Sequence, residues 1–154
     1  IIALARAGSI LHDDRYSSAA SAAQRFIEES MTDEHNRLFH RFRDGEAAHA
    51  GQLDDYAVYA LALLELYRTT LDVNYLKQAI LRAGQMTDLF EDEANGGYFL
   101  GARDAERLIA RPKELYDGAI PSGNSVAAVV LGRIASLTGD MLWQERSVMV
   151  PWIS

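Results

Sequence analysis

The fold is decided by the stretch LDDYAVYALALLELYRTTLD, residues 53–72. Apolar side chains recur in it every three or four residues, which is the spacing of one face of an α-helix, and a helix is predicted over Leu53–Leu71. Asp72 can cap a second helix, whose apolar residues continue at the same spacing from Tyr75 to Phe90. The stretch therefore predicts two helices joined by a tight turn.

The same pattern continues on both sides of this stretch. Further helices are predicted over about 1–11, from Asp13 or Asp14 to about Met31, from near Ser125 to Thr138, and around Trp143. Two shorter segments, Arg37–Phe42 and Gly97–Leu100, have alternating or aromatic side chains beside turn residues. These two segments predict small β-hairpins.

The predicted helix pairs form a repeat. A shift of 59 residues places Asp13 on Asp72, and a shift of 68 residues places Asp72 on Asp140, each with an aromatic residue three positions later. Chance can explain the matching Leu and Ala residues, but the threefold Asp-x-x-aromatic match is harder to dismiss. Because one pair of helices cannot bury both faces alone, the units must stack. We expect an all-α protein with small β-hairpins and antiparallel helix pairs, in which the three Asp residues cap the second helix of each pair.

Composition limits the functions that remain possible. The 154 residues are 49% hydrophobic and 24% charged, which is typical of one globular domain. A net charge of −7 argues against a nucleic-acid partner, and no stretch approaches the ~20 apolar residues that span a membrane. The absence of cysteine excludes disulfides, thiolate nucleophiles and cysteine-bound zinc. We expect a cytoplasmic protein.

Several motifs along the chain carry a resemblance to a known family. They are the stretch at 53–72, RFRDGEA at 41–47, GGYF at 96–99, RPKELYDGAIPSGNSVAA at 111–128 and LTGD at 137–140. Together they resemble the YyaL-like family, the spermatogenesis-associated thioredoxin-like proteins. The resemblance implies an (α/α)6 toroid, related to N-acylglucosamine 2-epimerases and six-hairpin glycosidases, that follows a thioredoxin-like domain. Residues 1–154 would then be one partial toroid domain, about half of the ring, with the thioredoxin-like domain outside the chain.

The ends of the sequence lead to an expectation about association. The chain starts without Met, and apolar residues crowd its last positions: Val148, Val150, Trp152 and Ile153. We expect a fragment of a larger protein, and half a toroid leaves apolar helices open on two flanks. If the fragment exists alone, we expect it to self-associate as a two-fold homodimer that covers these flanks. The alternative is that the flanks meet segments outside this chain.

The first candidate site is the polar loop that precedes the helix near Ser125. It contains Arg111, Lys113, Asp117, Ser122 and Asn124, which offer donors and acceptors beside a helix N-terminus. These residues are candidates to bind a ligand. The same residue types equally suit helix capping and the locking of a loop, so both interpretations stay open.

The second candidate site lies where the helix at 53 begins. Asp55 and Tyr56 could point into a toroid cavity, with Tyr98 from the neighbouring segment, where a carboxylate accepts sugar hydroxyls and a ring stacks on a sugar. The alternative is that the helix dipole alone favours two acidic residues, Asp54 and Asp55, at the N-terminus of a helix. Acid–base chemistry on a sugar would need a second carboxyl group about 5–10 Å away, and Asp117 or Glu114 could supply it.

The histidines suggest no metal site. His12, His35, His40 and His49 show no convincing ligand spacing, so no metal and no cofactor is expected. The related epimerases use two histidines, and neither has a counterpart that can be matched in this chain.

Two classes of function therefore remain. One is a carbohydrate-binding or carbohydrate-active domain that takes a sugar or a sugar-derived ligand, without nucleic-acid or membrane partners. The alternative is a non-catalytic domain that supports or docks a thioredoxin-like partner domain. The sequence does not decide whether the chain is an enzyme, because a fold does not fix a function.

Overall fold

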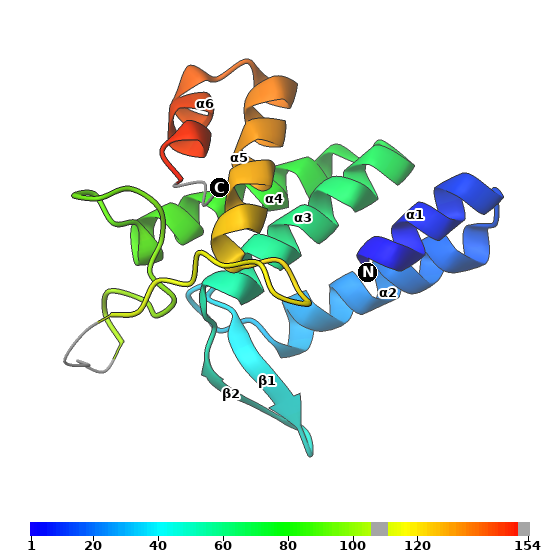
Figure 1. Ribbon diagram of the computed structural model, residues 1–154. Helices are drawn as coiled ribbons and strands as arrows, with labels where there is room; N and C mark the ends of the chain where they lie inside the picture. Colours follow the sequence, from blue (N-terminus) through cyan, green and yellow to red (C-terminus); the bar gives the residue numbers. More distant parts are fainter. Residues whose placement is uncertain (106–110, 151–154) are drawn as a thin grey trace.

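The computed structural model describes residues 1–105 and 111–150. Within them the helices are α1 Ile2–Leu11, α2 Asp14–Ser30, α3 Leu53–Thr70, α4 Val73–Phe90, α5 Gly123–Thr138 and α6 Met141–Val148. Strand β1, Phe39–Arg43, pairs antiparallel with β2, Glu46–Ala50, in a hairpin that projects from the connection between α2 and α3 (Figure 1). All the predicted helices are confirmed. Trp152 and Ile153, part of the apolar end of the sequence, lie outside the described residues.

The repeat is confirmed by its caps. Asp13, Asp72 and Asp140 each precede the second helix of a pair, and each side chain accepts a hydrogen bond from the backbone N–H two residues later. The residue before each Asp has a left-handed backbone that ends the first helix: His12, Leu71 and Gly139. A left-handed residue followed by Asp is thus the shared turn that reverses the chain between paired helices.

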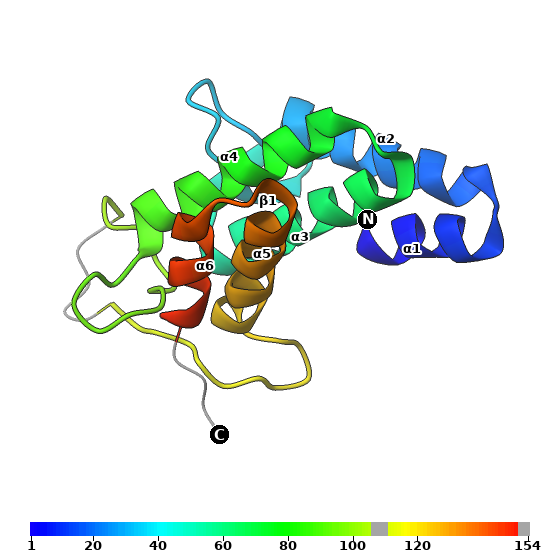
Figure 2. The ribbon, with the colours of Figure 1, turned by 90° about the horizontal axis from the view of Figure 1, so that it is seen from above.

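Helix α3 lies at the centre of the molecule. It packs against α4 along its length and also contacts α1, α2 and α5, whereas α2, α4 and α6 contact one another sparsely. Figures 1 and 2 show α1, α3 and α5 in succession, each followed by the helix it is paired with. Ten of the 18 residues of α3 are buried, so this helix is apolar around most of its circumference.

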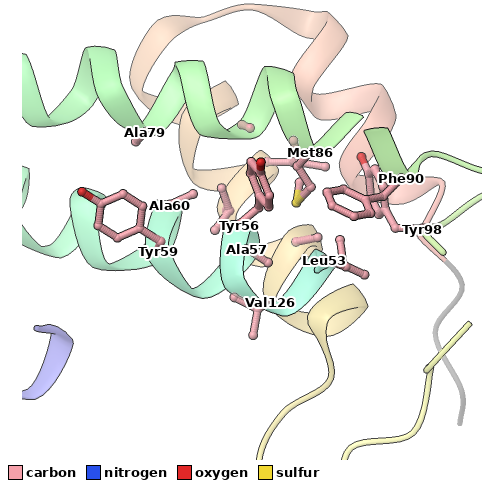
Figure 3. Packing of buried hydrophobic residues seen from close by; sticks show 14 of the residues in the cluster. Leu53, Tyr56, Ala57, Tyr59, Ala60, Ala79, Met86, Phe90, Tyr98 and Val126 are labelled. Atoms are coloured by element: carbon pink, nitrogen blue, oxygen red, sulfur yellow. The ribbon is translucent and has the colours of Figure 1, made fainter. Parts of the chain in front are cut away.

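The core lies mainly between α3, α4 and α5. Figure 3 shows the aromatic end of it, where Tyr56 of α3 packs beside Phe90 of α4 with ring centroids 5.3 Å apart. Tyr98, from the loop after α4, and Met86 close the same end, and each is at most 2% exposed. The core thus joins the loop after α4 to the beginning of α3.

The second predicted hairpin does not form. Gly97–Leu100 makes only an isolated bridge between Tyr98 and Glu91. The cause is a competing partner: the Asn124 side chain accepts from the Tyr98 N–H at 2.8 Å and donates to the Tyr98 carbonyl at 2.9 Å. An amide side chain therefore takes the place that a second strand would occupy.

A buried carboxylate ties the three helices α1, α3 and α5 together. The Glu65 side chain is 1% exposed and contacts Arg6 of α1, Arg68 of α3 and Arg133 of α5 at 2.9, 3.1 and 2.6 Å. Arg6, Glu65 and Arg133 are separated by 59 and 68 residues, the two shifts of the repeat. The arginines, Arg6 foremost, lower the pKa of Glu65 to about 2 despite its burial.

The cap of α4 gives a first prediction. Replacing Asp72 with Ala removes the acceptor for the Asn74 N–H and should lower the free energy of unfolding by about 1 kcal/mol. Lys77→Ala, on the exposed surface of the same helix, is the control and should change stability by less than about 0.5 kcal/mol. Urea unfolding of both variants measures this, and an equal effect of the two changes would contradict the capping role.

The pKa of Glu65 gives a second prediction. Because the folded state lowers this pKa from 4.5 to about 2, the charged group stabilises the fold above pH ~4.5, and this stability is lost as pH falls toward 2. Glu65→Gln should therefore be less stable than the native chain by about 3 kcal/mol at pH 6, and the gap should close near pH 2.

Urea unfolding at several pH values tests this, with Glu29→Gln as the exposed control on α2. The control should show a small gap at every pH. A gap for Glu65→Gln that is independent of pH would mean that the carboxylate charge contributes no stability.

Candidate functional site

The loop before α5 is fastened to the protein by Asn124. This residue is 1% exposed, and besides its two bonds to Tyr98 its Nδ2 donates to the Glu114 carbonyl at 2.9 Å. The next residue back, Gly123, lies so close to α3 that an added Cβ would meet Asp54 Oδ1 at 2.1 Å. The start of α5 therefore holds the loops at 96–99 and 111–117 against the start of α3.

Arg111 and Lys113 are also engaged within the protein. Arg111 donates to the backbone carbonyls of Leu89 and Gly101 and lies 4.2 Å over the Phe99 ring. Lys113 donates to the Gly96 carbonyl at 2.6 Å and pairs with Asp92 at 2.6 Å. The bond from Lys113 lowers the pKa of Asp92 well below its usual range. Arg111 and Lys113 thus bond backbone carbonyls on either side of Tyr98 and hold the loop at 96–101 in place.

The two tyrosines predicted to stack on a ligand lie in the core. Tyr56 is 1% exposed, and its hydroxyl accepts from the Leu38 N–H at 3.0 Å. Tyr98 is 2% exposed, and burial raises the pKa of its hydroxyl. Neither ring offers a face to solvent, because each fills the aromatic end of the core instead.

Asp117 and Ser122 organise the start of α5. Asp117 Oδ1 accepts from the Ser122 N–H at 2.8 Å, a bond that lowers the pKa of Asp117. Ser122 Oγ accepts from the Ser125 N–H and caps the helix. No ion pair joins Asp117 to Arg111 or Lys113 among the contacts of residues 1–105 and 111–150. Capping and loop locking thus describe the contacts that these residues make.

Asp55 is the predicted site residue that lies in an open groove. The groove has a volume of about 630 Å³ and lies where the N-terminal ends of α1 and α3 meet the C-terminal end of α2. Its wall is mostly apolar and includes Phe39, Val58 and Tyr59. The charged side chains in this wall are Asp54 and Asp55, whereas the Tyr59 hydroxyl donates to Glu28 at 2.6 Å.

Asp55 has partners that hold its position. Its Oδ2 accepts from the Gln52 N–H at 2.8 Å, as part of a capping box, and lies 2.8 Å from His40 Nδ1. His40 comes from β1, so the hairpin brings an imidazole to the rim of the groove. An imidazole that donates from Nδ1 would orient the carboxylate and keep it as a hydrogen-bond acceptor.

Asp54 is in a different environment. Its Oδ1 is buried and forms no hydrogen bond of ordinary geometry within the described part of the chain. Burial raises the pKa of Asp54, and the neighbouring carboxylates Glu114 and Asp55 raise it further, while the nearby amide of Gly123 offsets part of the rise. A carboxyl group whose proton is held more tightly than usual suits a hydrogen-bond or proton donor.

The sequence analysis missed Asp54 and His40 as site residues. The adjacent acidic pair in the stretch at 53–72 is the signal that could have pointed to Asp54, because one of two neighbouring carboxyl groups often becomes a weaker acid. His40 had no such signal, since 15 residues separate it from Asp55 and only the hairpin brings them together.

The described residues support no metal centre. Across 1–105 and 111–150, no group of three or more His, Asp or Glu side chains is arranged to hold a metal ion. No helix in the same ranges is both long and apolar enough to cross a membrane.

Relatives of the chain are found among curated proteins. It is 31% identical over 151 residues to spermatogenesis-associated protein 20 of Homo sapiens and 37% identical over 99 residues to the protein of the same name in Mus musculus. These alignments cover 92% and 64% of this chain but only 19% and 12% of the relatives, so the chain spans about a fifth of their length or less. An uncharacterised protein of Caenorhabditis elegans is 29% identical over 154 residues. No family profile matches the chain.

Solved structures identify the fold. A mannosidase of glycoside hydrolase family 76 from Bacteroides thetaiotaomicron superposes on 96% of this chain with a TM-score of 0.79 and 14% identity. A cellobiose 2-epimerase from Spirochaeta thermophila superposes on 96% with a TM-score of 0.76 and 19% identity. The chain covers 40% and 39% of these (α/α)6 toroid proteins. The fold expected from the sequence is thereby confirmed, as part of a helical toroid.

The Asn124 lock gives a third prediction. Asn124→Ala leaves the backbone polar groups of Tyr98 buried without partners, which should lower the free energy of unfolding by about 3 kcal/mol. Asn74→Ala makes the same substitution at an exposed position of α4 and should change stability little. Urea unfolding compares the two, and amide hydrogen exchange at Tyr98 should accelerate only in Asn124→Ala. Slow exchange at Tyr98 in that variant would show that another contact holds the loop.

Proposed function

We propose that this chain forms one wall of a carbohydrate-binding cavity. It is homologous to a segment of proteins named spermatogenesis-associated protein 20, and it has part of an (α/α)6 toroid fold. Asp54 and Asp55 supply the polar contacts to the sugar. One observation carries the proposal: two adjacent carboxyl groups, Asp54 and Asp55, line an open groove of about 630 Å³ whose wall is otherwise mostly apolar. A few polar groups in a mostly apolar pocket are the usual means by which a binding site fixes the orientation of a ligand.

The two carboxyl groups have complementary roles in this proposal. Asp54, whose pKa is raised by burial and by the neighbouring carboxylates, accepts from a sugar hydroxyl when ionised and donates to a sugar oxygen when protonated. Asp55, fixed by Gln52 and His40, accepts from a sugar hydroxyl. The apolar wall formed by Phe39 and Val58 packs against the C–H face of the ring, as apolar surfaces in ligand pockets commonly do. Acid–base chemistry on the bound sugar would use Asp54 as the acid.

Both superposed enzymes act on carbohydrates by name, a mannosidase and a cellobiose 2-epimerase. At 14% and 19% identity they support the fold of this chain and not its substrate. They do support the choice of sugars as the first ligands to test.

A specific observation favours a second candidate function, a non-catalytic interaction domain. Most of the polar residues near α5 are bonded to the protein itself: Asn124 to Tyr98, Arg111 to backbone carbonyls, and Lys113 to Asp92. A rigid loop of this kind suits a docking surface as well as it suits the rim of a cavity. The carbohydrate proposal ranks first because Asp54 and Asp55 line an open groove and take no part in these contacts of the loop.

The proposal is tested by measuring sugar binding to the full-length protein. Thermal unfolding with mannose, glucose, N-acetylglucosamine and cellobiose should show a rise in Tm with at least one sugar, because a ligand that binds the folded state stabilises it. Asp54→Asn should weaken this binding about tenfold or more, as expected when a charged or acidic hydrogen-bond partner is lost. Asp88→Asn, an exposed position on α4, is the matched control and should bind as the native protein does.

Without ligand, Asp54→Asn should be at least as stable as the native protein at pH 7. The raised pKa means that ionised Asp54 destabilises the fold above its unfolded pKa, a cost that disappears below about pH 3, where the group is protonated in both states. Stabilisation at pH 7 with loss of sugar binding supports a ligand site at Asp54. No effect of any sugar, or equal binding by Asp54→Asn, would instead favour the interaction domain.

A further inference from the structure

A second groove lies along the other half of α3. It has a volume of about 930 Å³ and is bounded by α1, α3 and α5. Its polar wall is made by the arginines that surround Glu65, namely Arg6, Arg68 and Arg133, and its apolar wall includes Ile10 and Leu137. Glu65 lies 11 residues after Asp54, or about 16 Å along the helix axis. The groove is therefore separate from the groove at Asp54.

The charge of this groove is opposite to that of the whole chain. Three guanidinium groups surround one carboxylate, which gives a local charge of +2 in a chain whose net charge is −7. Glu65, with a pKa of about 2, stays ionised at neutral pH, so this local charge is constant there. Burial of Glu65 and its contacts with all three arginines keep the positive groups together despite their repulsion.

The guanidinium groups keep many free donors. Each guanidinium group has five N–H bonds. Within the described chain, all three arginines donate to Glu65: Arg6 and Arg133 each through one terminal nitrogen, and Arg68 through its Nε. The side chains are 48%, 56% and 41% exposed for Arg6, Arg68 and Arg133. The remaining N–H groups are thus available to the groove.

We propose that this groove binds the oxyanion of a small organic ligand, a phosphate or a carboxylate group. Guanidinium forks match the geometry of both anions, and Glu65 holds the forks in place before the ligand arrives, which lowers the entropic cost of binding. Ile10 and Leu137 pack against the carbon skeleton of the ligand. A purely structural tie of α1 and α5 to Glu65 would need two arginines, Arg6 and Arg133, whereas Arg68 of α3 itself adds a third half-exposed guanidinium group.

Calorimetric titration tests the proposal in the protein as its gene encodes it. The probes are inorganic phosphate, glucose 6-phosphate, glucuronate and neutral glucose. We expect binding of at least one anionic probe that weakens as NaCl rises, and about tenfold weaker binding in Arg133→Gln and in Arg68→Gln. Arg41→Gln, an exposed position in β1, is the control and should bind the anion as the native protein does.

The two arginine variants keep the test decisive if one of them destabilises the fold. Arg68 is the more exposed of the two, and a thermal melt of each variant shows whether it is folded at the temperature of titration. Unchanged anion affinity in a folded Arg68→Gln or Arg133→Gln would overturn the proposal, as would the absence of binding for all three anions at about 10 mM. Asp54→Asn separates the two sites: it should weaken the binding of neutral sugars and leave anion binding unchanged.

Discussion

The structure depends on the burial of α3 from nearly every side. A helix with ten buried residues among 18 cannot be stable in water alone, so α1, α2, α4 and α5 must all pack against it. Polar groups on such a helix are tolerated only where the packing opens or where partners arrive from neighbouring helices. The first case is met at Asp54 and Asp55, where the helix begins, and the second at Glu65, which receives arginines from α1 and α5.

The carboxyl groups of Glu65 and Asp54 on α3 differ in the charges that surround them. Glu65 has more positive partners than it needs, and its pKa falls to about 2. Asp54 has acidic neighbours and a buried oxygen, and its pKa rises. Opposite shifts of two carboxyl groups on a single helix show that the surrounding side chains, rather than the helix itself, determine the protonation of each. The same helix therefore carries a carboxyl group of raised pKa near its start and one of lowered pKa in its second half.

The sequence predicted the fold far better than the site. Asp13, Asp72 and Asp140 act locally, through a bond to an amide two residues away, and local chemistry can be seen in a single chain. The roles of Tyr98 and Asn124 depend on a contact across 26 residues, for which no helical spacing gives a signal. The same is true of His40 and Asp55, which only the hairpin brings together. Residues of the loop at 111–125 were ambiguous because a lock and a binding site use the same polar groups.

The row of charged residues Arg6, Glu65 and Arg133 also bears on the number of repeats that a closed ring could contain. These residues occupy one level of successive repeats, and their charges read positive, negative, positive. A closed ring can continue such an alternation without placing two like charges side by side only if it contains an even number of units. Six units satisfy this condition and five or seven do not. Alternating charge at this level of the repeats is thus compatible with a six-unit ring, a condition that the shape of the apolar core does not impose.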